Sequence, residues 1–121
     1  MKRALAVLVM AISIFSVELA ADTSAGAAAR EGRREAQSNI REGRLILRTY
    51  GFASRGTASS QKVFERYGVR REAVAGCMVS PAILAETAAY NDVMKAEIRK
   101  RFGAAALDEI EGRSTPAHRR R

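Results

Sequence analysis

The sequence has little of the chemistry that most active sites use. Among 121 residues there are one cysteine, one histidine and no tryptophan, and aromatic residues make up 6% of the chain. A single cysteine cannot form a disulfide within the chain, and a single histidine cannot supply the several ligands of a zinc site. The histidine, His118, lies in an arginine-rich C-terminal segment. The usual serine–histidine and cysteine–histidine mechanisms would therefore have to use a residue of the tail.

The sequence also lacks an apolar run long enough to span a membrane. Lys2 and Arg3 precede an uncharged stretch, Ala4–Val17, which ends at Glu18. A membrane-spanning helix needs about 20 apolar residues. A cationic start, a short apolar core and small residues after it are typical of a cleavable export signal.

We therefore predict a signal peptide over residues 1–25, cleaved after Ala21 or after Ala25. The mature protein is expected to be periplasmic or secreted, bacterial, and without a transmembrane segment. Its only cysteine lies far from the signal, so no lipid anchor is expected at the new N-terminus.

Positive charge dominates the chain, with a formal net charge of +8. Part of this excess lies in residues 113–121, which end in Arg119, Arg120 and Arg121 and are predicted to form a disordered basic tail. Basicity favours anionic partners such as phospholipid headgroups, envelope polymers or nucleic acid. The low aromatic content disfavours nucleic acid, because no platform for base stacking is evident.

The periodicity of apolar residues predicts the order helix, strand, helix, strand, helix. The first helix is expected to be charged and well formed only from Glu35 to Glu42, because Gly32 weakens the segment before it. The next three elements are predicted at Arg44–Tyr50 (strand), Ser60–Tyr67 (helix) and Glu72–Val79 (a second, more buried strand).

The strongest local signal is Ser80-Pro81, since serine is a good N-cap and proline a good first helical residue. The helix that starts there is predicted to stop at Gly103, followed by a short one within Ala104–Glu111. At 100° per residue its apolar sector contains Ile83, Leu84, Thr87, Tyr90, Asn91, Met94, Ile98 and Phe102, and Ala89 faces the other way.

These elements predict a small α/β (or α+β) domain of βαβα type over residues 26–112. It has a charged N-terminal helix and a long C-terminal amphipathic helix. A helix between the two strands makes them parallel. Because a two-stranded sheet is marginally stable, either a helix covers an open edge or two copies form a homodimer through their strand edges.

Three residues of the predicted domain have ambiguous roles. Cys77 precedes the long helix and is either a buried apolar residue, half of an intermolecular disulfide or a reactive thiol. Asn91 either bonds backbone groups at the end of a strand or lines a ligand pocket together with Tyr90. The structural role is the preferred prediction in each case.

Four segments resemble a set of small exported bacterial proteins that have no assigned activity. They are Tyr67–Val69, Ala75–Val79, Tyr90–Met94 and Ile98–Gly103. The resemblance covers Leu45–Gly103. It implies an envelope or secreted bacterial protein and no particular chemistry.

The preferred hypothesis is a non-enzymatic exported basic protein that binds an envelope protein or an anionic polymer, with Arg119–Arg121 as an electrostatic tether. The alternative is an enzyme or redox factor that uses Cys77 or a Tyr90/Asn91 pocket. The sequence assigns no catalytic residue, metal ligand or cofactor, since most carboxylates alternate with Arg or Lys as on a solvated helix surface.

Overall fold

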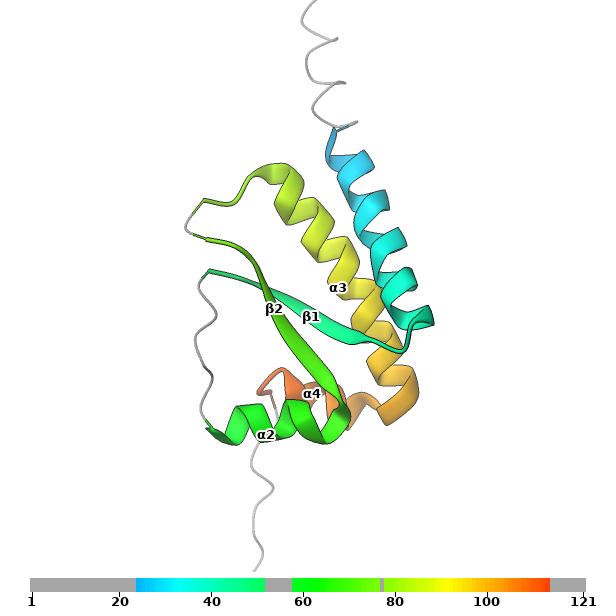
Figure 1. Cartoon of the computed structure of the whole chain (residues 1–121), viewed down its shortest axis with the longest axis vertical. Coiled ribbons are helices and arrows are strands. Elements are labelled where there is room, and N and C mark those ends of the chain that lie inside the picture. Colours follow the sequence, from blue (N-terminus) through cyan, green and yellow to red (C-terminus); the bar gives the residue numbers. More distant parts are fainter. Residues whose placement is uncertain (1–23, 52–57, 77, 114–121) are drawn as a thin grey trace, which may run out of the picture.

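The computed structural model describes residues 24–51, 58–76 and 78–113. A helix over residues 24–41, called here the N-terminal helix, is followed by β1 (Leu45–Tyr50), α2 (Ala58–Tyr67), β2 (Val69–Ala75), α3 (Pro81–Phe102) and α4 (Ala104–Ile110) (Figure 1). Helices joined to a small sheet form an α+β domain, as the sequence predicts.

The sheet of the described residues has two parallel strands, and α2 makes the crossover between them. Leu45 pairs with Val69, and the register continues to Thr49 opposite Ala73. Tyr50 then pairs with Ala75, so one residue of β2 is left over as a bulge. The strands cross at a marked angle (Figure 1), as a strongly twisted two-stranded ribbon does.

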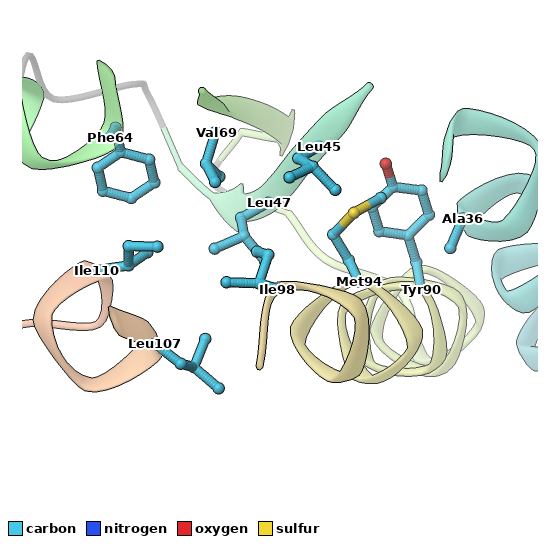
Figure 2. Packing of buried hydrophobic residues seen from close by; sticks show 10 residues of the cluster. All are labelled: Ala36, Leu45, Leu47, Phe64, Val69, Tyr90, Met94, Ile98, Leu107 and Ile110. Atoms are coloured by element: carbon cyan, nitrogen blue, oxygen red, sulfur yellow. The ribbon is translucent and has the colours of Figure 1, made fainter. Parts of the chain in front are cut away.

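One face of the sheet covers the core. Leu45 and Leu47 of β1 and Val69 of β2 are buried there with Phe64 of α2. Residues of α3 and α4 close the other side, as Figure 2 shows: Met94, Ile98, Leu107 and Ile110. The alternation along β1 follows from the period of two in a strand.

The ends of the helices follow local signals in the sequence. Gly43 has a φ of 75°, a left-handed conformation that favours glycine, and its N–H donates to the carbonyl of Ile40. At the start of α3, Ser80 accepts a hydrogen bond from the backbone N–H of Ile83, 3.3 Å away. The cap at Ser80 was predicted, and α3 runs to Phe102 as expected.

The prediction of a frayed first helix is wrong. The N-terminal helix is continuous over residues 24–41 and packs beside α3 (Figure 1). Gly32 is buried, and a Cβ placed on it would overlap the backbone carbonyl of Glu86 and lie 3.2 Å from its Cα. Gly32 therefore permits a close helix–helix approach, and this contact outweighs the intrinsic cost of glycine in a helix.

The predicted bounds of the second strand are also wrong. β2 spans Val69–Ala75 instead of Glu72–Val79, and Arg70–Ala73 are exposed. The apolar run that suggested a strand continues past its end to Met78, which is 89% exposed. β2 is thus an edge strand with charged residues, a feature that protects open edges from unwanted pairing.

The predicted apolar sector of α3 is partly right. Thr87, Tyr90, Met94 and Ile98 are buried, but Leu84 and Phe102 are 48% and 42% exposed. Ala89, expected to face solvent, is buried. The reason is that α3 is covered on two sides, by the sheet and by the N-terminal helix, so its buried surface is wider than one sector and turned toward Ala89.

Gly32→Ala tests the contact between the two helices. In an exposed helix this change stabilises by up to about 1 kcal/mol. Here we expect it to lower the free energy of unfolding by about 1–3 kcal/mol, because the methyl group meets backbone that cannot rotate away. Urea denaturation of the chain that starts at Asp22 measures the change.

Gly26→Ala is the matched control, since a Cβ there meets only the flexible end of Arg30 at 3.7 Å. The control is expected to be neutral or stabilising. A stabilising Gly32→Ala would show that the N-terminal helix does not pack on α3 at this point.

Candidate functional site

The side chain of Asn91 closes part of the open edge of β1. Its Oδ1 accepts a hydrogen bond from the backbone N–H of Arg48, and its Nδ2 donates to the carbonyl of the same residue, both at 2.9 Å. The amide thus imitates one residue of a neighbouring strand. Of the two roles considered for Asn91, the structure has the one in which it bonds strand backbone.

Tyr90 is a residue of α3 whose side chain is completely buried between β1 and the N-terminal helix (Figure 2). Its hydroxyl oxygen accepts a hydrogen bond from Asn39 Nδ2 at 2.9 Å. Asn39 Oδ1 in turn accepts two from Arg44, at 2.8 and 3.1 Å. The polar ends of Tyr90 and Asn91 are therefore engaged within the protein, which favours structural roles for both over the lining of a ligand pocket.

Arg48 is the centre of a polar network that joins three elements to β1. Its Nη2 donates to Glu35 of the N-terminal helix at 2.5 Å, and its Nε donates to Glu72 of β2 at 3.2 Å. Glu86 of α3 lies 3.5 Å from Nη1. The guanidinium also stacks on the ring of Tyr90, 3.9 Å from its centroid.

The Arg48 side chain is only 10% exposed. Burial would lower its pKa, but the hydrogen bonds and charges of Glu35 and Glu72 outweigh burial and raise the pKa above its ordinary value. Arg48 therefore stays charged. The charges that would remain without it, those of Glu35, Glu72 and Glu86, are on side chains 42%, 51% and 37% exposed, so water would compensate them in part.

The face of the sheet opposite the core carries charge and is partly covered where Arg48 packs against Glu35 and Glu86. The register places Ile46 and Arg48 on this face beside Arg70 and Glu72. Two shallow hollows of about 380 and 300 Å³ lie on it, and Glu72 lines both. The carboxylates of their linings, Glu35, Glu72 and Glu86, are all in ion pairs with Arg48. Arg70 and Arg71 of the first hollow have no carboxylate partner among the described residues.

A second feature is a surface of unpaired cations on the N-terminal helix and on the last turns of α3. We call it the basic helix face and define it by five exposed residues: Arg30, Arg33, Arg41, Arg99 and Lys100. Within the described ranges, no carboxylate forms an ion pair with any of them.

The charges of the N-terminal helix are segregated around its axis. Arg30 and Arg41 are about 20° apart and Arg33 is about 60° to one side, at 3.6 residues per turn. Glu35 and Glu42 lie on another flank, where they pair with Arg48 and Arg44. Glu31 pairs with Arg34 of the same helix, so Arg30, Arg33 and Arg41 are left without a carboxylate partner among the described residues.

The other residues that the sequence singled out are not among those that the structure describes. Cys77 lies in a gap of the described chain, and Arg119, Arg120 and Arg121 follow its last residue. The basic tail and residues 1–23 of the predicted signal peptide also fall outside. The roles proposed for them stay predictions.

Sequence reasoning missed Arg48 and Asn39 as the residues that organise the structure. Arg48 interrupts the apolar strand Leu45–Tyr50 and could have been noticed as a charge where the neighbours are buried. Its partners lie 13 to 43 positions away in the sequence, so no local pattern identifies them.

In the part of the chain that the structure describes, no three acidic, histidine or cysteine side chains are placed to hold a metal ion. No helix among these residues is both long and apolar enough to cross a bilayer. Comparisons of the chain with protein-family models, with curated proteins and with solved structures give no match.

Burial raises the pKa of Tyr90 above the usual value for tyrosine, and Asn39 and the charge of Arg48 lower it only in part. A raised folded-state pKa means that the neutral phenol stabilises the fold below about pH 10 and that this contribution is lost as pH rises further. We therefore expect stability to fall above about pH 10 more steeply in the native chain than in Tyr90→Phe.

Urea midpoints measured from pH 8 to pH 11 compare the two proteins. Tyr90→Phe also removes the bond from Asn39, so the quantity compared is the slope with pH and not stability at one pH. Equal slopes would contradict the burial of a neutral Tyr90 hydroxyl.

Proposed function

We propose that the chain is an exported, non-enzymatic protein that binds an anionic component of the bacterial cell envelope through the basic helix face. The observation that carries the proposal is the exposed row of arginines on the outer side of the N-terminal helix, where no described carboxylate pairs with them. Export follows from the predicted signal peptide, and the mature protein is then periplasmic or secreted.

The helix dipole accounts for some of these cations but not for all. Positive residues in the last turn of a helix complement its negative end, and Arg99 and Lys100 lie in the last turn of α3. Arg30 and Arg33 lie well before the end of their helix. The dipole effect falls off within a turn, so these two arginines need another explanation, and an anionic partner provides one.

The two helices run in the same direction, which brings Arg41 beside Lys100. Gly32 packs on Glu86, Asn39 bonds Tyr90, and Arg41 lines a groove with Lys100. The end of the N-terminal helix thus lies beside the end of α3 (Figure 1). Arg119–Arg121 are proposed to add to the same attraction from the C-terminal tail.

The structure also bears on the proposed cleavage bond. Residues 24 and 25 are already helical, so cleavage after Ala21 would leave the described part of the N-terminal helix intact. Cleavage after Ala25 would remove its first described residues. We propose Ala21 as the residue before the bond.

A homodimer through strand edges would have to form through β2. Asn91 occupies the edge of β1 at Arg48. β2 carries three consecutive charged residues, Arg70, Arg71 and Glu72, next to its bulge, which are features that discourage edge pairing. The anionic partner is therefore the preferred proposal over self-association.

Binding to vesicles that contain phosphatidylglycerol tests the proposal. Each basic residue near an anionic surface contributes about 1 kcal/mol, so Arg30→Gln with Arg41→Gln is expected to weaken binding by about 30-fold. Binding of the native chain should also weaken steeply as salt rises. Sedimentation of the protein with vesicles measures both.

The matched control is Lys62→Gln with Arg70→Gln, which removes the same charge from α2 and β2. It is expected to reduce binding by less than about threefold, since long-range attraction alone then acts. Equal losses in the two double variants would mean that net charge, and not the basic helix face, governs binding. Absence of binding by the native chain to anionic vesicles and anionic polymers would end the proposal.

A further inference from the structure

A groove runs between the N-terminal helix and α3 near the C-terminal ends of both helices, where Arg41 and Lys100 lie. Its volume is about 470 Å³, within the range of about 300–1,000 Å³ that is usual for small-molecule sites. Its lining comes from both helices: Gln37, Ile40, Arg41, Val93, Ala96, Glu97 and Lys100.

The groove has an apolar floor and a charged end. Ile40 and Val93 are half-buried and Ala96 is exposed, so apolar surface faces the opening. Arg41 is the last helical residue of its helix, and Lys100 lies a turn beyond Ala96. An apolar stretch therefore leads to two cations.

The carboxylate on the rim does not cancel this charge. Glu97 accepts a hydrogen bond from Arg101 at 2.7 Å. Arg41 and Lys100 have no carboxylate partner in the described residues. The rim thus presents free positive charge beside apolar surface, which is complementary to a molecule with one anionic group and one apolar chain.

We propose that this groove binds a single-chain anionic amphiphile, with its acyl or alkyl chain on Ile40, Val93 and Ala96 and its phosphate or carboxylate at Arg41 and Lys100. The inference rests on the proposed function and deepens it, because it makes the anionic envelope component a lipid. An anionic polymer without an apolar chain would use the basic helix face but not the groove floor.

Three ligands that differ in headgroup charge or in chain length test whether binding needs both the anion and the long chain. They are dodecyl phosphate, dodecyltrimethylammonium and butyl phosphate, each below its micellar concentration. Titration calorimetry with the chain that starts at Asp22 is the measurement. Dodecyl phosphate is expected to bind at least about tenfold more tightly than either of the others, because it alone offers both the long chain and the anion. Equal binding of the cationic detergent would overturn the proposal.

Ala96→Phe tests whether the ligand binds in the groove, since an aromatic ring there fills the groove without changing its charge. It is expected to weaken dodecyl phosphate binding by about tenfold or more, whereas the exposed control on the same helix, Ala88→Phe, should leave it within about twofold. Unchanged binding in Ala96→Phe would overturn the proposal.

Lys100→Gln provides a second variant that keeps the groove open. It is expected to weaken dodecyl phosphate binding about fivefold, against little change for Lys62→Gln on α2. Equal effects of the two lysine variants would also count against the groove. If the groove variants bind dodecyl phosphate normally while the Arg30/Arg41 variant still loses vesicle binding, the groove proposal fails and the proposed function stands.

Discussion

The structure depends on how a sheet of only two strands is completed. Each strand of such a sheet has one edge without a strand partner, and an isolated pair is marginally stable in water. Here α3 supplies the missing partner at one point, where Asn91 bonds both backbone groups of Arg48. The side chain of the same Arg48 reaches Glu35, Glu72 and Glu86. One residue of β1 thus fixes the strand to α3, to β2 and to the N-terminal helix.

This arrangement also decides which charges are left for a partner. Glu35 of the N-terminal helix pairs with Arg48 of β1, and Glu42, in the turn after the helix, pairs with Arg44. The outer side of the N-terminal helix then presents Arg30 without a described carboxylate partner. The proposed binding surface follows from this partition of charge, since a helix with alternating signs on every face would attract anions weakly.

The sequence predicted what local chemistry determines and missed what only tertiary contact determines. The cap at Ser80 is a local signal, and α3 begins where it was expected. Its helix propensity suggests that Gly32 weakens the first helix. In the fold Gly32 allows that helix to pack against the backbone of Glu86, 54 positions later in the sequence. Asn91 was expected to bond backbone groups at the end of a strand. It does bond strand backbone, but its partner Arg48 lies inside β1 and could not be named, since the two are separated by 43 positions. The second strand was predicted too far along the sequence. The prediction looked for an apolar run, whereas β2 is an edge strand that carries charged residues.

Hydrogen exchange at the backbone amide of Arg48 measures whether Asn91 closes the edge of β1. An amide on an open strand edge exchanges through small local fluctuations, whereas one bonded to a buried partner exchanges only when a large part of the domain opens. We expect this amide to exchange with a free energy close to that of global unfolding, and Asn91→Ala to make it exchange orders of magnitude faster at a pH where the domain remains folded. Rapid exchange of the Arg48 amide in the native chain would contradict the role of Asn91 in closing the edge of β1.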